Sequence, residues 1–427
     1  MLTGFTKSEK GWIMYDWANS AYSILVASLL PIYSGAVGGA EGIAPAAQAS
    51  QWAWAVSLSA LIVGLLAPVL GSMADYRGMR KRLFTGFFVL GVSATALLSV
   101  VNGYFSLLLL FGLTNIGFAG ANVFYDAFLV DVAAFERMDK VSAWGYGMGY
   151  IGGSTIPFVA SIALYILSED NLAVLNISGN GAIRLSCVLT AVWWALFTIP
   201  FFKNVRQVSF IEHERGIVRQ SFRRLASTLR DMKKDKRMFR FFIAYFLYIN
   251  GVGAIIMMAS KLASSIGFNT LYIVGGLFLT QIVAFPCSIL YDRLGERFTH
   301  RRMIIVGIIT YIVVCIIGFF MTKEWQFIIL ACLVGTAQGG IQALSRSYFG
   351  KLIPDKRRAG EFFGIYNIFG KFESVLGTML MAVVLMFTED VHYGVLPVLA
   401  FFIAGGILMA STDKGEIEVT YNGAKDA

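Results

Sequence analysis

Long apolar segments recur along the whole chain and are separated by short polar connections. A helix needs about 20 predominantly apolar residues to cross the hydrocarbon core of a bilayer. Segments of this kind occupy residues 11–35, 50–74, 83–102, 104–128, 141–167, 182–202, 239–261, 269–291, 302–321, 325–348, 361–386 and 392–410. The pattern predicts an all-α polytopic membrane protein with twelve transmembrane helices, and a count of eleven or thirteen would require a strained division of these segments.

One long polar stretch, residues 203–238, divides the predicted helices into two groups of six. We therefore expect an N-terminal six-helix bundle over residues 1–202, and a C-terminal six-helix bundle with a short tail over residues 239–427. The first apolar segment carries Asp16 and aromatic residues early and has no small-residue cleavage site at its end. We interpret it as a retained helix rather than a signal peptide.

The polar linker itself shows helical periodicity. Phe222, Leu225, Leu229 and Met232 recur at intervals of three and four residues, and basic residues lie between them. A helix with an apolar side and a basic polar face binds at the interface of anionic membranes. We therefore expect this helix to lie on the anionic cytoplasmic leaflet of the lipid bilayer.

Composition agrees with a membrane protein, and the charge distribution predicts its orientation. The chain is 57% hydrophobic and 14% charged, whereas soluble proteins carry about 25% charged residues. With a cytoplasmic N-terminus, nearly all of the 35 Lys and Arg residues lie in or beside cytoplasmic segments; the exceptions are Arg184, Lys261, Lys323 and Lys371. The positive-inside rule then predicts that both termini are cytoplasmic. The net charge of +9 has this topological origin, so we do not expect nucleic acid as a partner.

The two halves of the chain repeat one motif. The stretch after the second predicted helix is "GSMADYRGMRKRL" and the stretch after the eighth is "SILYDRLGERFTHRRM". Both contain D-x-x-G-x-R, formed by Asp75, Gly78 and Arg80 in the first half and by Asp292, Gly295 and Arg297 in the second. An internal repeat at half-chain spacing is typical of membrane transporters.

The first copy of this motif resembles the loop 2–3 signature of the major facilitator superfamily, although Tyr76 stands where an Arg is usual. More specific stretches resemble the vacuole-effluxer-like, or unknown major facilitator, branch of that superfamily. They are "YDWANSAY" (15–22), "FYDAFLVDVA" (124–133), "SAWGYGMGYIGG" (142–153) and "GTAQGGIQALSRSYFGKLIPDKRRAGEFFGIYNIFGKFESVLG" (335–377). One departure is Asp126, where the branch is expected to carry Asn, and another is Val130, where Pro is usual.

The resemblance implies a major-facilitator-type fold of two six-helix bundles and a gate at the cytoplasmic end. In such a gate the Asp of the motif faces the terminus of a neighbouring helix, and the basic residues pair with acids such as Asp131 or Glu136. The residues that we expect to act in gating are Asp75, Gly78, Arg80, Asp131, Asp292 and Arg346. The alternative is that the loop is only a basic connection that follows the positive-inside rule. Fungal members of the branch export amino acids from the vacuole, which implies a similar class of substrate.

The first predicted helix carries two overlapping polar stripes, one of Tyr15, Asn19 and Tyr22 and the other of Asp16, Asn19 or Ser20, and Ser23. The candidate site residues on them are Asp16, Asn19 and Tyr22. A polar stripe on a spanning helix must face other helices or a water-filled cavity. Asp16 lies about 7 to 8 Å inside a helix that starts at Gly11, which is near the cytoplasmic mouth. We expect these three residues to bind substrate or couple transport to protons; a helix–helix hydrogen bond or a gate contact is the alternative.

The eleventh predicted helix carries charges deep in the bilayer. Lys371 is ten residues past Glu361, which places it about 15 Å along the helix and near the middle of the core. Lys371 is a candidate ligand for a substrate carboxylate, and Glu373 is a candidate proton site or partner for a substrate amine. Together they suit a zwitterion. A structural ion pair with another helix is the alternative reading.

The tenth predicted helix places Gln338, Gln342 and Arg346 at intervals of four residues, as a single polar stripe. The two glutamines are candidates for substrate binding or for hydrogen bonds between helices. The fifth predicted helix contains overlapping G-x-x-x-G pairs, followed by Pro157. Such glycines permit close helix packing, and the proline permits a bend.

The chain shows no motif typical of an enzyme. It contains no Walker A sequence, no H-E-x-x-H and no pairing of a nucleophile with a base, and its three histidines lie in predicted loops or at helix ends. Carboxylates must therefore carry any protons in mid-membrane. We expect no cofactor and no metal.

The sequence thus predicts a secondary active transporter that works by alternating access, with proton-coupled efflux of amino acids or similar small zwitterions. The compact loops are typical of prokaryotic proteins, so we expect the protein in the cytoplasmic membrane. We also expect it to be a monomer. The alternatives are an exporter of drugs, lipids or organic anions on the same fold, a membrane scramblase or enzyme, and a sensor without transport activity.

Overall fold

The computed structural model describes residues 2–168, 170, 173–212, 217–371, 379–381, 383–384, 387–388 and 391–412. These residues form helices almost throughout. The N-terminal half contains α1 (Lys7–Ala40), α2 (Pro45–Ala74), α3 (Met79–Leu97), η1 (Leu98–Val100), α4 (Tyr104–Ala127), α5 (Leu129–Val132), η2 (Phe135–Arg137), α6 (Met138–Met148), η3 (Gly149–Thr155), α7 (Ile156–Ile166) and α8 (Gly179–Asn204). The linker forms α9 (Ile217–Lys234). The C-terminal half contains α10 (Lys236–Ile266), α11 (Thr270–Phe298), α12 (His300–Phe319), α13 (Glu324–Leu352), η4 (Lys356–Arg358), α14 (Ala359–Lys371), η5 (Val391–Val395) and α16 (Leu396–Ala410).

Within the described part of the chain, 11 helical stretches are long and apolar enough to cross a membrane. Each matches one of the predicted spans. The remaining prediction, residues 361–386, begins as α14 and then runs over residues 372–378, which lie outside the described residues. α1 starts earlier than the predicted boundary at residue 11, because Thr6 and Glu9 form a capping box. The Glu9 amide donates to the Thr6 hydroxyl at 3.2 Å, and the Thr6 amide donates to the Glu9 carboxylate at 2.7 Å.

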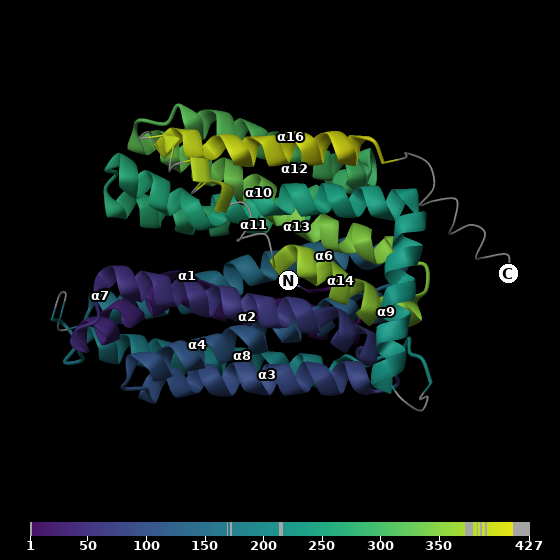
Figure 1. Cartoon of the computed structure of the whole chain (residues 1–427), viewed down its shortest axis with the longest axis horizontal. Coiled ribbons are helices and arrows are strands. Elements are labelled where there is room, and N and C mark those ends of the chain that lie inside the picture. The colour runs from purple at the N-terminus through teal and green to yellow at the C-terminus, as the bar shows by residue number, and fades with distance from the viewer. Residues whose placement is uncertain are drawn as a thin grey trace.

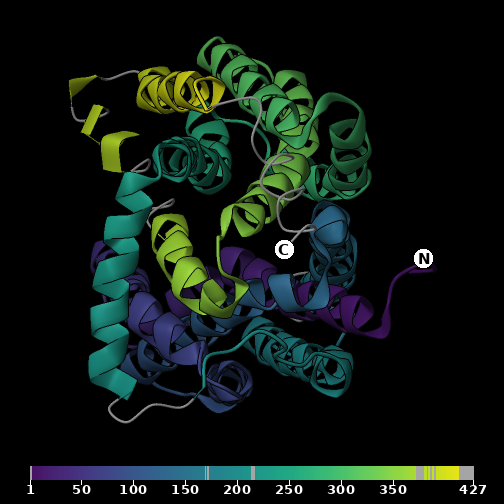
Figure 2. The ribbon, with the colours of Figure 1, turned by 90° about the vertical axis from the view of Figure 1, so that its right-hand side faces the viewer.

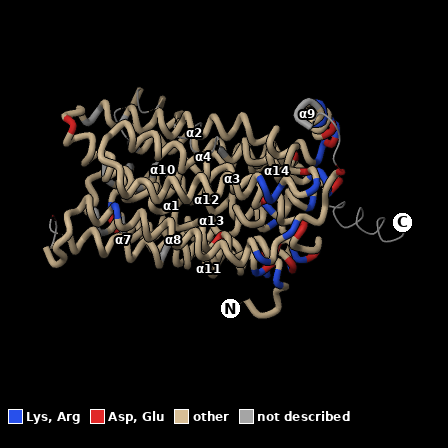
Figure 3. Tube along the Cα trace, turned by 90° about the horizontal axis from the view of Figure 1, so that it is seen from below, with Lys and Arg blue, Asp and Glu red and all other residues tan. Residues whose placement is uncertain are grey.

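The axes of the spanning helices are roughly aligned with one another, and α9 lies across one end of them (Figure 1). Helices of the N-terminal half form one layer and those of the C-terminal half form the other, with α6 and α14 between them. Most Lys, Arg, Asp and Glu residues gather at the end that also carries α9, the N-terminus and the last described residues (Figure 3). We call this the charged end.

The two halves pack closely where α2 meets α14. A Cβ atom on Gly71 would lie 2.2 Å from the Gly360 carbonyl oxygen, and one on Gly364 would lie 2.5 Å from the Ala67 carbonyl oxygen. The glycine-rich fifth span packs against α1 in the same way, because a Cβ on Gly153 would lie 2.3 Å from the Ser20 Cβ. Its middle, η3, is π-helical and directly precedes α7. A π-helical turn is one way to bend a helix without breaking it.

The linker helix α9 lies along one edge of the charged end (Figure 2). It packs on α2, α10 and α14. The four apolar residues that periodicity assigned to one face have different environments. Met232 is buried and Leu225 is half-buried, whereas Phe222 and Leu229 are 55% and 51% exposed.

Candidate functional site

A cavity of about 390 Å³ lies between the two halves of the molecule. Its walls come from α1, α4, α6 and η3 on one side, and from α10, α11, α13 and α14 on the other. This volume is within the usual range of small-molecule sites. The cavity brings together five residues that the sequence singled out, namely Asp16, Asn19, Gln338, Gln342 and Arg346.

Arg346 on α13 is the central cation of this cavity. Its Nη2 lies 3.1 Å from Asp16 Oδ2 on α1, and its Nη1 lies 3.2 Å from Asp126 Oδ1 on α4. The guanidinium also donates to the hydroxyl and carbonyl oxygens of Ser142. It stacks over the Tyr146 ring, with 4.2 Å between the guanidinium carbon and the ring centroid. A buried guanidinium needs this density of partners, because an unpaired charge away from water is costly. One side chain of the C-terminal half therefore binds two carboxylates of the N-terminal half.

Neutral polar groups complete the walls. The Asn367 amide of α14 donates to Asp126 Oδ2 at 3.1 Å, and the Asn19 amide donates to Asn122 Oδ1 at 2.8 Å. The Tyr150 hydroxyl lies 2.8 Å from Gln342 Oε1. Among the described lining side chains, two carboxylates face one guanidinium, so the formal charge of the site is −1 when both carboxylates are ionised.

The structure differs from the sequence-based expectations at two positions, Arg346 and Tyr22. Arg346 was expected in a gate at the cytoplasmic end, but it lines the cavity itself. Tyr22 was expected to bind substrate, but it points into the N-terminal half, where its hydroxyl bonds to Thr114 at 2.6 Å and its ring packs against Trp194. The physical reason is rotational: Tyr22 lies on the side of α1 that faces its own bundle.

Periodicity did not mark Asp126, although the sequence contained a signal for it. It is one of two positions at which this chain departs from the pattern expected in the resembling family, with Asp in place of Asn. Lys371 ends α14, but its side chain is not among those described, and Glu373 lies outside the described residues. Their roles in substrate binding stay predictions.

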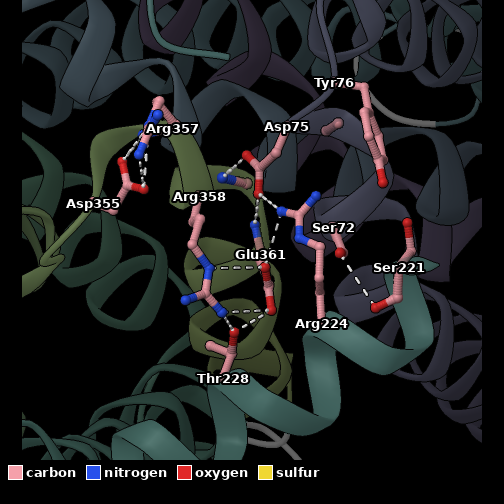
Figure 4. A network of polar contacts seen from close by, with 12 residues as sticks. Ser72, Asp75, Tyr76, Ser221, Arg224, Thr228, Asp355, Arg357, Arg358 and Glu361 are labelled. Atoms are coloured by element: carbon pink, nitrogen blue, oxygen red, sulfur yellow. Dashed lines mark hydrogen bonds and ion pairs between the residues drawn. The ribbon is translucent and has the colours of Figure 1, made fainter. Parts of the chain in front are cut away.

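A second polar cluster lies at the charged end and is built around Asp75, the C-cap of α2. Asp75 Oδ1 accepts from the Gly360 amide at 2.7 Å and Oδ2 accepts from the Glu361 amide at 3.0 Å (Figure 4). These amides belong to the first turn of α14, where free N–H groups and the helix dipole favour an anion. Arg80 adds an ion pair at 2.9 Å. Asp75 thereby joins the two halves of the molecule.

The turn between α2 and α3 holds Arg80 in place. Gly78 has φ of 73°, a left-handed conformation that glycine adopts without steric cost. The turn directs Arg80 back into the protein, where it is fully buried and binds Asp131 Oδ2 at 2.5 Å and the Ala127 carbonyl at 3.2 Å. Burial raises the pKa of the Asp75 carboxyl to about 7, against the opposing effects of Arg80 and the α14 amides.

The linker helix takes part in the same cluster, which the sequence did not indicate. Arg224 Nη2 lies 3.2 Å from Glu361 Oε2 and 3.5 Å from Asp75 Oδ2. The Thr228 hydroxyl donates to Glu361 and accepts from Arg358 (Figure 4). α9 therefore contacts α2 of one half and α14 of the other through polar groups.

The second copy of the repeated motif forms a different cluster. Asp292 Oδ1 lies 3.7 Å from His300 Nε2, which in turn lies 3.4 Å from Asp139 Oδ2 on α6. Asp139 also pairs with Lys351 and accepts from the Ser347 hydroxyl at 2.6 Å. This cluster likewise connects the two halves, through α6 on one side and α11, α12 and α13 on the other.

Comparisons with known proteins agree with this architecture. A family model described as vacuole effluxer Atg22 like matches residues 6–418. An uncharacterized MFS-type transporter of Bacillus subtilis (strain 168), YxiO, is 46% identical over 414 residues, which covers 96% of each chain.

Solved structures show the same fold at low sequence identity. The human organic anion transporter MFSD10 has a TM-score of 0.72 and 14% identity, with 94% of this chain and 99% of that chain covered. FucP of E. coli, in its outward conformation, has a TM-score of 0.71 and 14% identity, with 97% and 99% covered. These neighbours are transporters of the major facilitator superfamily, so the predicted fold class is confirmed and the chain is a multi-pass membrane transporter rather than an enzyme. The chain belongs to the vacuole effluxer Atg22-like family of the major facilitator superfamily.

Proposed function

We propose that this protein exports amino acids or similar small zwitterions by alternating access, with protons as the coupling ion. The observation that carries this proposal is the set of Arg346, Asp16 and Asp126 on opposite walls of one cavity. Secondary transporters of this type bind substrate between two bundles that rock about the site.

The chemistry of the set matches an amino acid. A guanidinium is suited to bind a carboxylate through two parallel hydrogen bonds. A carboxylate on the opposite wall is suited to bind an ammonium group. Because a zwitterion is neutral overall, it leaves the formal charge of −1 in place, and one proton on Asp16 or Asp126 neutralises the site. The surplus of negative charge disfavours a purely anionic substrate.

The same groups suit the coupling of binding to motion. Arg346 ties the C-terminal half to α1 and α4 of the N-terminal half. A substrate carboxylate competes with Asp16 and Asp126 for this guanidinium, and a proton on either carboxylate weakens its ion pair. Either event loosens a tie between the bundles, which shifts the balance between conformations.

We place the charged end on the cytoplasmic side of the cytoplasmic membrane, with both termini cytoplasmic, because the positive-inside rule favours that side for Lys and Arg. The Asp75 and Asp139 clusters, which join the two halves at this end, fit a state closed toward the cytoplasm. Proton coupling is in keeping with the described activity of FucP, a fucose:proton symporter. Export is in keeping with the description of the family.

The first experiment is counterflow of radiolabelled amino acids into proteoliposomes, which needs no knowledge of the driving ion. We expect exchange of some amino acids by the wild-type protein and a loss of at least about tenfold in Arg346→Gln, because charge-assisted hydrogen bonds to the substrate are lost. Arg293→Gln is the matched control, since Arg293 is exposed and does not line the cavity. If a folded wild-type protein exchanges no amino acid, the substrate class is wrong.

A second experiment separates coupling from binding. Asp126→Asn keeps the shape of the side chain and removes its proton site. We expect counterflow to persist in this variant, while export driven by a proton gradient falls to the rate without a gradient. Equal loss of both activities would assign Asp126 to substrate binding instead.

A further inference from the structure

α9 presents two chemically different sides. Its inner side is formed by Ser221, Thr228 and Met232, which are buried against the ends of the spans. Its outer side carries exposed basic residues, namely Arg223, Arg230, Lys233 and Lys234. These outnumber Asp231, the exposed carboxylate of the described outer surface of this helix.

Two large apolar side chains lie at the border between these sides. Phe222 and Leu229 are 55% and 51% exposed, and they are seven residues apart, so they lie on the same line along the helix. The exposed Ala226 lies between them. About half of each of these two residues is left uncovered by the protein, and an exposed apolar stripe beside a basic face is the pattern of helices that lie in a membrane interface.

The position of α9 fits a membrane partner. The helix runs across the spans rather than along them, and it lies at the edge of the charged end instead of covering its centre (Figures 1 and 2). It packs against the last turns of α2 and the beginnings of α10 and α14. In a multi-pass protein this is the level at which helices leave the hydrocarbon core, so the outer side of α9 lies where lipid headgroups are found.

The inner side of α9 connects this surface to the clusters that join the two halves. Arg224 pairs with Asp75 of α2 and with Glu361 of α14, and Thr228 bonds to Glu361. α9 therefore holds one group from each half at the same time. Any partner that fixes α9 in this position stabilises the contact between α2 and α14.

We propose that the outer side of α9 binds the anionic headgroup surface of the adjacent leaflet, and that this binding holds the charged end closed. Lipid binding by α9 is independent of the proposed function, whereas its effect on transport rests on that function. The basic residues bind lipid phosphates, and Phe222 and Leu229 insert at the boundary between headgroups and acyl chains. A leaflet rich in anionic lipid then favours the state in which Arg224 and Thr228 hold Glu361.

Hydrogen exchange of the α9 amides tests the binding. The full-length protein is placed in nanodiscs of phosphatidylcholine alone or with added phosphatidylglycerol. We expect exchange in residues 217–234 to slow on the order of tenfold with the anionic lipid. Arg223→Gln with Arg230→Gln should abolish this difference. Phe222→Ser with Leu229→Ser should reduce the protection in both lipids.

The matched control is Arg293→Gln with Arg297→Gln, which removes the same charge from exposed positions at the same end. This variant should keep the full lipid response. An equal loss in the control would indicate a general charge effect and overturn the proposal. Equal exchange in the two lipids would also overturn it, as would equal slowing by soluble inorganic phosphate in phosphatidylcholine nanodiscs, which would indicate a free-anion site.

Counterflow in the same two lipid compositions then tests the effect on the closed end. We expect anionic lipid to change the exchange rate of the wild-type protein but not that of Arg223→Gln with Arg230→Gln. A lipid response in both variants, or in neither, would remove the link between α9 and closure. If no transport of any amino acid is found while the hydrogen-exchange result holds, the proposed substrate fails and lipid binding by α9 stands.

Discussion

The two copies of D-x-x-G-x-R have the same sequence pattern but form different structures. In the first copy, α2 ends at Ala74, and a turn through Gly78 begins α3. In the second copy, α11 continues as a helix through Asp292 to Phe298. Arg80 therefore folds back and is fully buried beside Asp75, whereas Arg297 stays on the last helical turn and is exposed.

The difference extends to the helix that each Asp faces. Asp75 meets the free amides of Gly360 and Glu361 at the start of α14. Asp292 lies near Asp139, the second residue of α6, and among the described residues the basic side chain within ion-pair distance of Asp292 is His300. In the first copy, a buried arginine and two backbone amides surround the Asp75 carboxylate. In the second copy, the imidazole of His300 lies between the Asp292 and Asp139 carboxylates, and among the described residues no backbone amide of a helix N-terminus donates to Asp292.

Removal of the motif carboxylate should give the largest difference in stability between the two copies. Asp75→Asn leaves the buried Arg80 with one carboxylate instead of two, and we expect it to cost about 3 to 5 kcal/mol of stability. Asp292→Asn should stay within about 1 kcal/mol, because it also relieves repulsion from Asp139. Thermal unfolding in detergent compares them. Equal destabilisation by the two substitutions would contradict the asymmetry.

The motif arginines give the next largest difference. Arg80→Lys keeps the charge but loses the planar geometry that reaches Asp75, Asp131 and the Ala127 carbonyl together. We expect it to cost about 2 kcal/mol, whereas Arg297→Lys should stay within about 0.5 kcal/mol. The same unfolding measurement checks both variants, and a neutral Arg80→Lys would show that its geometry carries little free energy.

Substitution of the motif glycines should give a smaller difference in stability between the two copies. Gly78→Ala forces a side chain into the left-handed conformation and should cost about 1 kcal/mol. Gly295 lies within α11, where alanine suits the backbone, but its Cβ would lie 2.5 Å from the His300 ring. Gly295→Ala should therefore displace the His300 side chain, and it should cost less stability than Gly78→Ala because the backbone is not strained. A destabilisation equal to that of Gly78→Ala would contradict the difference in backbone conformation between the two copies.

The pH response rests on one carboxyl group and has a definite sign. The pKa of Asp75 is raised to about 7 by burial in the closed end, and it returns toward about 3.9 if opening exposes the carboxyl. The closed state therefore binds the proton more tightly, so its stability is greatest at low pH and declines as the pH rises toward 7.

We expect the ratio of closed to open protein to rise about tenfold from pH 8 to pH 6, because the closed-state carboxyl changes from mostly ionised to mostly protonated over this range. Distances between spin labels at positions 82 and 293 would report this ratio. Asp75→Asn should remove the response, because it removes the carboxyl whose pKa differs between the two states. A wild-type ratio that falls as the pH is lowered would contradict the assignment.

Much of the fold could be predicted from the sequence, because its signals are local. Hydropathy marked the spans, the polar linker marked the division between the halves, and a family-specific stretch such as "YDWANSAY" indicated the superfamily branch. Intervals of three and four residues also placed Asp16, Asn19, Gln338 and Gln342 on polar stripes, and all four line the cavity. A polar side chain in a spanning helix must face other helices or a water-filled cavity, because exposure to lipid is costly.

Only the tertiary structure decided which stripes meet. Arg346 pairs with Asp16, 330 positions away in the chain, and with Asp126, 220 positions away, and no local pattern encodes such a pairing. Tyr22 shares a helix with Asp16, yet it faces the other way because of how α1 is rotated in its bundle. The two motif copies diverge for a similar reason, since the helix that each Asp faces is brought there by the packing of the two halves. Hydrophobic periodicity determines that a helix crosses the membrane, and packing determines what each of its polar groups contacts.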